Sequence, residues 1–386
     1  MKTIFFNISS RLPIPATKGG AIETLLTMLI EQNEIDQKVR FVLPSVHDEQ
    51  AEQISKTYQH TKIVFTHREE KPCSYALFWR LNKIFHKHQN INHLEYKNCR
   101  LAKDHRADIV VVEDCSCWPY QYLKRKYSPD RLWVHLHAEL VPDQPMIDAF
   151  KKTIAISEFV KRRWLEPCPV GEHECKVVYN CVDEEKFERK ESLTPKKKEA
   201  LRKMLGFSKD DVILIYVGRI APVKGVRELL AAVRKTENVK LLLIGRMREY
   251  DMDYVREIQD TVDAMGNKVK ALGYIPNDEL YQYYQIADIQ VIPSMWEEAA
   301  GLVCIEGMYA GLPMIVTDSG GLVEYVTKEC ALIARRSDVI NELAHRITVL
   351  RDNPELRKQM GEASVKRAKQ FTKKRYYDDF LAALGV

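Results

Sequence analysis

The segment IQVIPSMWEEAAGLVCIEGMYAGLPMIVTD, residues 289–318, decides the fold class of this chain. It begins with a short apolar run at 289–294, continues through a polar loop into a helical stretch at 302–310, and ends with a second apolar run at 313–318. Both apolar runs are nearly continuous rather than alternating, which is typical of strands buried on both faces of a parallel sheet. This order predicts a strand–helix–strand unit of a doubly wound α/β domain.

The same alternation extends over the rest of the chain. Further strands are predicted at 3–7, 39–44, 62–65, 108–114, 132–137, 153–157, 176–180, 212–218, 240–245 and 269–273. Helices are predicted at 23–32, 158–164, 225–235, 254–265 and 341–350. We therefore predict an α/β protein of two Rossmann-like doubly wound domains, with the default binding site in an interdomain cleft.

A composition change marks the border between the two domains. Residues 184–203 are highly charged, contain Pro195 and hold no apolar run, as expected of a hinge. We place an N-terminal domain at 1–186 and a C-terminal domain at 200–370. The tail at 371–386 is predicted to be a helix that crosses back onto the first domain. Its apolar residues follow helical spacing: Tyr376, Tyr377, Phe380, Leu381 and Leu384.

Length and composition exclude several classes of protein. A chain of 386 residues with 45% hydrophobic and 29% charged residues is long enough for two compact cores and ordinary for a globular protein. No uncharged apolar run reaches the length of about 18 residues that a membrane-spanning helix needs. The first residues fit a buried strand better than a signal peptide. Nine cysteines without regular pairing favour a reducing cytoplasm, where we expect the protein to reside.

The net charge of +5 is modest, but basic residues cluster. One cluster comprises Arg80, Lys83, Lys87, Lys97, Arg100, Lys103 and Arg106, and shorter ones lie at 124–126 and 161–163. They form either solvated helix faces or a surface for anionic lipid or a pyrophosphate-linked acceptor. The second interpretation predicts peripheral contact with the inner face of the cell membrane. No nucleic-acid signature accompanies these charges, so a nucleic-acid partner is not expected.

The loop GRIAPVKG at 218–225 directly follows a predicted strand. Its two glycines let the backbone approach a ligand, and Arg219 and Lys224 lie where a helix start adds partial positive charge. This arrangement suits a diphosphate. The alternative is an ordinary loop with surface cations.

Two glutamates lie in the loop and helix of the opening segment. Glu298 and Glu306 are separated by seven residues. A helix that begins near Gly301 leaves the N–H groups of Gly301, Leu302 and Val303 unpaired and ready for phosphate oxygens. One carboxylate can then accept the ribose hydroxyl pair, and the other lies closer to the sugar.

This block resembles the Glu-x7-Glu signature of family 4 glycosyltransferases, which are retaining enzymes of the GT-B fold. The resemblance extends over essentially the whole chain. PATKGGAIE at 15–23 is similar to the first Gly-Gly loop of the family, and NCVD at 180–183 to the Asn-Gly-Val-Asp turn that closes the first domain. SGGLVEYV at 319–326 matches the Gly-Gly-x-x-Glu loop, and His137 stands where the family has a cleft histidine.

The resemblance implies a role for each matching residue. Arg219 and Lys224 would neutralise the leaving pyrophosphate, Glu306 would bind the ribose, and Glu298 would act on the transferred sugar by positioning and electrostatics. Gly19 and Gly20 would approach the donor phosphate, and the amides of 301–303 would bind the donor. His137 would lie near the transferred sugar. The donor would be a nucleotide diphosphate sugar, with UDP foremost and GDP and ADP behind it, and the acceptor a surface glycan or a lipid-linked sugar.

In the mechanism that the resemblance implies, the leaving phosphate accepts the acceptor's proton on the same face of the sugar. It requires no metal and no strong protein base, in agreement with the shortage of obvious Asp/His pairs in the sequence. The chain departs from the family at Cys181, which replaces a glycine, and at Ala299 and Ala300, which replace a Gly-Phe type pair. His137 can also be read as a satisfied structural histidine, and His135 lies one pleat position earlier.

Other classes of function are considered beside this one. A Rossmann dehydrogenase would need a G-x-G-x-x-G turn after the first strand, which is absent. Asp251 and Asp253 have the letters of a metal-binding Asp-x-Asp motif but fall near a helix start, and Cys168, His173, Cys175 and Cys181 match no common zinc spacing. A nucleotide-sugar 2-epimerase and a catalytically silent nucleotide-sugar-binding subunit share the GT-B scaffold and remain as alternatives.

Overall fold

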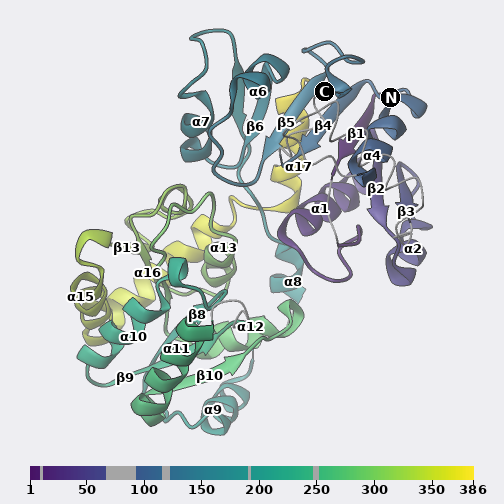
Figure 1. Cartoon of the computed structure of the whole chain (residues 1–386). Coiled ribbons are helices and arrows are strands. Elements are labelled where there is room, and N and C mark those ends of the chain that lie inside the picture. Colours follow the sequence, from purple (N-terminus) through teal and green to yellow (C-terminus); the bar gives the residue numbers. More distant parts are fainter. Residues whose placement is uncertain (9–11, 67–92, 115–121, 190–192, 247–251) are drawn as a thin grey trace. The chain divides into compact units, whose positions relative to one another are not determined.

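The structure is a computed structural model that describes residues 1–8, 12–66, 93–114, 122–189, 193–246 and 252–386. The chain divides into two compact units (Figure 1). The first comprises residues 1–180 and 373–386, and the second comprises residues 181–372. Each unit contains a parallel sheet with helices packed against it, so the predicted α/β class is confirmed.

The first unit is built on a seven-stranded sheet of order β3-β2-β1-β4-β5-β6-β7. Its strands are β1 (Thr3–Asn7), β2 (Arg40–Val46), β3 (Thr61–Thr66), β4 (Ile109–Glu113), β5 (Leu132–Leu136), β6 (Lys152–Ala155) and β7 (Glu174–Val177). Its helices are α1 (Ala21–Asp36), α2 (Glu49–Ser55), α4 (His93–Asp104), α6 (Gln144–Ala149), α7 (Glu158–Leu165) and α17 (Lys373–Leu384).

The second unit is built on a six-stranded sheet of order β10-β9-β8-β11-β12-β13. Its strands are β8 (Val212–Val217), β9 (Val239–Ile244), β10 (Val269–Gly273), β11 (Ile289–Ile292), β12 (Met314–Thr317) and β13 (Ala331–Ala334). Its helices include α8 (Glu184–Arg189), α9 (Pro195–Met204), α10 (Val226–Lys235), α11 (Met252–Met265), α12 (Asn277–Ile286), α13 (Leu302–Tyr309), α14 (Leu322–Tyr325), α15 (Val339–Asp352) and α16 (Pro354–Ala368).

The strand order reverses at one point in each sheet. In the first unit the reversal lies between β1 and β4, and in the second between β8 and β11. Strands beside these points are almost wholly buried, which explains their continuous apolar runs. Because loops diverge at such a switch point, a ligand crevice is expected at the carboxyl ends of the two strands.

The terminal helix α17 belongs to the first unit, as predicted. It packs along α1, where the Tyr377 hydroxyl donates to Asn33 Oδ1 at 2.7 Å (Figure 1, yellow). Phe380 contacts Phe6 of β1 and the ring of His135 in β5, with centroid distances of 5.8 and 5.4 Å. These apolar residues of α17 therefore complete the core of the first sheet.

One strand of the second sheet was not predicted from the sequence. β13 is four residues long and lies at the sheet edge, and its two central residues, Leu332 and Ile333, are not buried. Its sequence ALIA is apolar throughout, but a run of four apolar residues is too short to distinguish a strand from a segment of buried helix. Among the described helices, none combines the length and hydropathy needed to cross a membrane.

Candidate active site

The loops at the carboxyl ends of β8 and β11 pack backbone to backbone. Gly225 has φ +69°, and a Cβ at this position would lie 1.8 Å from the carbonyl oxygen of Pro293. Nearby, the Met295 N–H donates to the carbonyl of Val223 at 2.9 Å. Only glycine allows this approach, and it brings Lys224 of one loop next to Glu298 of the other.

Glu298 is held by two groups at a single oxygen. Its Oε1 lies 2.5 Å from Lys224 Nζ and 2.5 Å from the hydroxyl of Ser294, and the residue is 9% exposed. The ring of Trp296 lies beneath the same lysine, with Nζ 4.8 Å from the ring centroid. The structure thus joins two predicted site residues, Lys224 and Glu298, in one ion pair.

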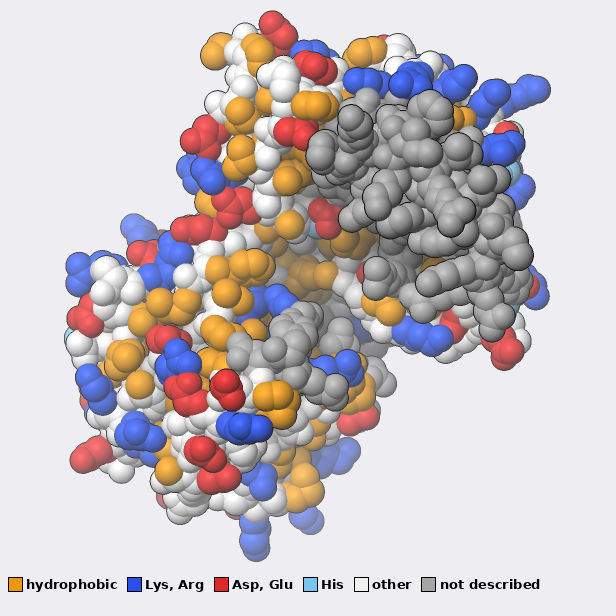
Figure 2. Space-filling view, in the orientation of Figure 1, with side chains coloured by type: hydrophobic (Ala, Val, Ile, Leu, Met, Phe, Trp, Pro, Cys, Tyr) orange, Lys and Arg blue, Asp and Glu red, His pale blue; other side chains and the backbone are white. Residues whose placement is uncertain are grey.

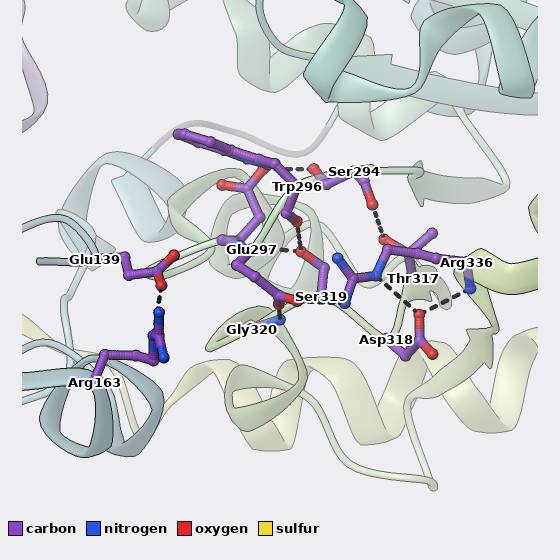
Figure 3. Close-up of polar contacts among 11 residues, drawn as sticks. Glu139, Arg163, Ser294, Trp296, Glu297, Thr317, Asp318, Ser319, Gly320 and Arg336 are labelled. Atoms are coloured by element: carbon purple, nitrogen blue, oxygen red, sulfur yellow. Dashed lines mark hydrogen bonds and ion pairs between the residues drawn. The ribbon is translucent and has the colours of Figure 1, made fainter. Parts of the chain in front are cut away.

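The loop after β12 fixes the backbone of Glu298. The Glu298 N–H donates to Ser319 Oγ at 3.1 Å, and the Gly321 N–H donates to the Glu298 carbonyl at 2.6 Å. Gly320 has φ +44°, and a Cβ there would lie 2.4 Å from the same carbonyl oxygen. Ser319 Oγ in turn donates to the carbonyl of Trp296 at 2.5 Å (Figure 3).

Glu297 has different partners from its neighbour. Its Oε2 accepts the Gly320 N–H at 2.6 Å, and its Oε1 pairs with Arg336 at 2.7 Å (Figure 3). Arg336 also contacts Asp318 Oδ1 at 3.2 Å. Glu297 therefore ties two loops together, whereas the Glu298 carboxylate pairs with Lys224.

Glu306 lies on α13 and accepts a hydrogen bond from the Tyr284 hydroxyl at 2.8 Å. Burial raises the pKa of the Glu306 carboxyl to about 7, although the Tyr284 hydroxyl and the charge of Lys186 act in the opposite direction. The partner Tyr284 is a buried residue of α12 that the sequence analysis did not identify. It appears in sequence only as one aromatic residue of an amphipathic helix.

Donors and a cation without partners lie on the same edge of the second sheet. The N–H groups of Cys304 and Ile305 donate to the Gly301 carbonyl, so helical bonding in α13 begins there. Within the described residues, the amides of 301–303 donate to no protein group. The half-buried guanidinium of Arg219 also pairs with no described residue. The backbone carbonyl of Arg219 accepts a hydrogen bond from the Tyr216 hydroxyl at 2.8 Å.

The remaining predicted site residues lie in the first unit. Gly19 and Gly20 immediately precede α1, with φ +75° and +101°. His137 follows β5, and its Nε2 lies 2.6 Å from Glu113 Oε2. The same oxygen is 3.0 Å from Nδ1 of His135. Burial alone would raise the pKa of Glu113, but the charges and hydrogen bonds of the two histidines lower it to about 2.

Glu113 was missed by the sequence analysis, which noted a shortage of obvious Asp/His pairs and did not consider a glutamate as the partner of the histidines. The only signal was an acidic residue at the end of a buried strand next to the histidine-bearing strand. A metal ion is bound by histidine nitrogens, cysteine sulfurs and carboxylate oxygens. In the described part of the chain, Glu113, His135 and His137 form the one group of three residues in which such atoms all lie within 4.8 Å of one another. The cysteine-rich set considered for zinc is not such a group, and His173 Nε2 instead lies 2.9 Å from the Ile147 carbonyl.

The basic clusters are partly described. Arg80, Lys83 and Lys87 lie outside the described residues, as does the side chain of Lys97. Exposed basic side chains of the first unit include Arg100, Lys103, Arg106, Lys124, Arg125 and Lys126. Figure 2 shows Lys and Arg side chains in a row along the upper edge of this unit. Asp251 also lies outside the described residues, whereas the fully exposed Asp253 pairs with Arg256 at 3.7 Å.

Comparison with known proteins identifies the class of enzyme. Residues 197–367, which include β8 to β13, match the family described as glycosyl transferases group 1. A lipopolysaccharide 1,2-N-acetylglucosaminetransferase of Salmonella typhimurium is 25% identical over 339 residues, covering 84% of this chain and 83% of the relative. The protein is a glycosyltransferase. Spore coat protein SA of Bacillus subtilis is 22% identical to this glycosyltransferase over 93% of both chains.

Solved structures agree on the architecture. A glycosyltransferase from Rickettsia africae superposes with a TM-score of 0.76 at 19% identity, covering 99% of this chain and 97% of that one. Anabaena HepE in complex with UDP and glucose has a TM-score of 0.74 at 20% identity, with coverage of 100% and 99%. The predicted GT-B fold is therefore confirmed for this glycosyltransferase.

Proposed function

We propose that this glycosyltransferase transfers a hexose from a UDP-sugar to a surface glycan or lipid-linked acceptor, with retention of the anomeric configuration. The observation that carries the proposal is the Lys224–Glu298 ion pair beside unpaired helix-start amides. A lysine and the amides of 301–303 offer positive charge to a diphosphate, and a carboxylate next to them offers negative charge to a sugar.

Each group has a distinct task in this reaction. Arg219 and Lys224 neutralise the charge that develops on the leaving diphosphate when the glycosidic bond breaks. Glu298 stabilises the positive charge that develops on the sugar ring, and Glu306 accepts the ribose hydroxyls. The acceptor hydroxyl attacks from the same face and passes its proton to the leaving phosphate, as in family 4 enzymes.

The names of the relatives support this choice of substrates. The Salmonella relative is named for transfer of N-acetylglucosamine to lipopolysaccharide, and HepE was solved with UDP-glucose as well as with UDP and glucose. Both are consistent with a UDP-sugar donor, and the first with a surface-glycan acceptor.

The test combines donors and acceptors. The protein is incubated with UDP-, GDP- and ADP-sugars, with and without lipid-linked or glycan acceptors, and the products are followed by NMR. We expect acceptor-dependent release of UDP and an axial-to-axial or equatorial-to-equatorial outcome at the anomeric carbon. Epimer formation from donor alone would indicate a 2-epimerase, and binding without turnover a silent subunit. An inverted product would exclude retention.

UDP is expected to stabilise the protein without added metal. Two cations and helix-start amides already supply the positive charge that a magnesium ion would otherwise provide. A thermal-shift titration with UDP in EDTA should match the titration in magnesium. Loss of the UDP-dependent shift in EDTA would contradict this prediction and favour a metal site at Asp251 and Asp253.

UDP binding is expected to weaken on acidification because of Glu306. The carboxyl is mostly protonated below its pKa of about 7, whereas ribose hydroxyls donate to the ionised form. Binding should therefore release a proton, and the affinity should fall by up to about tenfold per pH unit below the pKa. The same raised pKa links the stability of the fold to pH. Below pH 4.5, the usual pKa of a glutamate, protonated Glu306 contributes fully to the stability of the folded state, and this contribution is lost as the pH rises to about 7.

Calorimetry between about pH 5.5 and about pH 8 measures this linkage. Glu306→Gln is the control, because it retains a hydrogen-bond acceptor for Tyr284 but cannot ionise. Titration of the UDP phosphates is common to both proteins and cancels in the comparison. Identical pH profiles for the two proteins would disprove the assignment of Glu306.

We also propose that the protein is cytoplasmic and binds anionic membranes peripherally through its N-terminal unit. Lys124, Arg125 and Lys126 are exposed, and none forms an ion pair with a described residue. Each cation near an anionic surface contributes about 1 kcal/mol, so removal of all three should weaken binding roughly 100-fold. Flotation with anionic and neutral liposomes at low and high salt measures it.

The control is Lys161→Ser, because Lys161 already pairs with Glu158 at 3.3 Å. We expect this variant to bind like the wild type, and the triple serine variant of 124–126 to lose binding to anionic vesicles. Equal binding of the wild type to both vesicle types would refute the proposal.

A further inference from the structure

A buried carboxylate joins two histidines at the switch point of the first sheet. Glu113 is the last residue of β4, and its register partner in β5 is His135. His137 lies two residues further along, so its side chain returns to the same face of the sheet. The two imidazole rings have a centroid distance of 4.1 Å, and both contact Glu113 Oε2.

The hydrogen-bond donors of this group follow from the charge of Glu113. Glu113 Oε2 lies within hydrogen-bond distance of a ring nitrogen of each histidine, and a carboxylate can only accept hydrogen bonds. Both histidines must therefore donate: His135 from Nδ1 and His137 from Nε2. A neutral imidazole carries one N–H, so Nδ1 of a neutral His137 holds a free lone pair.

The two histidines differ in access. The side chain of His135 is fully buried, packs against Phe380, and its Nε2 has no partner among the described residues. Burial lowers the pKa of His135, so it remains the neutral support of the group. The side chain of His137 is 7% exposed, which makes it the member that a solvent molecule or substrate can reach.

The distances favour hydrogen bonds over a metal ion. The nitrogen–oxygen separations are 2.6 and 3.0 Å. Ligand atoms around a tetrahedral zinc ion at about 2.0–2.1 Å would lie about 3.3 Å apart. A carboxylate shared by two N–H donors explains the observed geometry without an ion.

We infer that Glu113 is a positioning residue that holds His137 with Nδ1 as a hydrogen-bond acceptor for a substrate hydroxyl. The inference rests on the proposed function for the contact between His137 and substrate. The carboxylate fixes the ring orientation and the Nε2–H tautomer, so no reorientation is needed when the hydroxyl arrives. Glu23 of α1 and Asp114 are the other carboxylates that act on the two histidines.

The first experiment reads the tautomers directly in the substrate-free protein. In ¹⁵N-histidine-labelled wild type at neutral pH, we expect His137 as the Nε2–H tautomer and His135 as the Nδ1–H tautomer. In Glu113→Gln, His137 should lose this preference and show a mixture of tautomers. An Nδ1–H tautomer of His137 in the wild type, or zinc bound at one ion per chain after dialysis against zinc, would overturn the inference.

The second experiment measures the effect of these residues on the rate of sugar transfer. Glu113→Gln and His137→Ala should each lower the turnover number about 10- to 100-fold, with the UDP dissociation constant unchanged. The double variant should be no worse than His137→Ala, because both changes remove one hydrogen bond to substrate. Glu113→Asp keeps the charge and should recover part of the turnover.

The control is His173→Gln, which changes a part-buried histidine whose one hydrogen bond among the described residues is to the Ile147 backbone carbonyl. It should leave the tautomers of the other histidines and the turnover unchanged. Additive losses in the double variant would overturn the positioning role. If the wild type showed the expected tautomers but transferred no sugar, the proposed function would fail while the geometry of the group stood.

Discussion

Glu298→Gln is expected to lower the turnover number about 100- to 1000-fold while UDP binds as tightly as to the wild type, or more tightly. The amide oxygen still accepts from Ser294, but the negative charge that stabilises the oxocarbenium-like sugar is lost. Lys224 loses its counter-charge at 2.5 Å, so its ammonium group becomes fully available to the diphosphate. Calorimetry with UDP and turnover with a working acceptor measure the two effects separately.

Glu297→Gln is the matched control for this experiment. The carboxylate of Glu297 pairs with Arg336 and the Gly320 N–H, so its replacement should loosen the loop and change turnover less than about tenfold. Glu298→Gln with wild-type turnover, or with a large loss of UDP affinity, would show that the carboxylate does not act on the sugar.

Lys224→Met is expected to weaken UDP binding roughly 10- to 100-fold and to reduce turnover as well. The variant removes one cation from the diphosphate site and leaves the Glu298 carboxylate without its ion-pair partner. An uncompensated, largely buried carboxylate destabilises the folded state, so the melting temperature should also fall. Titration of UDP and thermal unfolding without ligand measure the two effects.

Arg219→Met separates the two causes. Arg219 has no ion-pair partner among the described residues, so its removal should cost UDP affinity without lowering the melting temperature of the ligand-free protein. Lys235→Met, at the other end of α10, removes a surface lysine whose one hydrogen bond within the described residues is to Asn341, and it should change neither the UDP affinity nor the melting temperature. Unchanged UDP affinity in both Arg219→Met and Lys224→Met would show that the diphosphate does not bind at this loop.

Local pattern was sufficient for much of the fold. The buried central strands β1, β4, β8 and β11 were predicted because strands covered on both faces require continuous apolar runs. The return of the terminal helix was predicted because an amphipathic tail must bury its apolar face. The edge strand β13 was not, because its apolar run ALIA is only four residues long and does not distinguish a strand from buried helix.

The sequence by itself determined which loops carry the candidate site, since a polar or glycine-rich segment after a buried strand must lie at the carboxyl edge of a parallel sheet. Arg219, Lys224, Glu298 and Glu306 were named for this reason. Only the tertiary structure decided which of these side chains meet. The Lys224–Glu298 pair joins residues 74 positions apart, and Glu113 is joined to His135 by strand register across 22 positions. Hydrophobic periodicity specifies the face on which a side chain lies, but register and loop packing decide its hydrogen-bond partner.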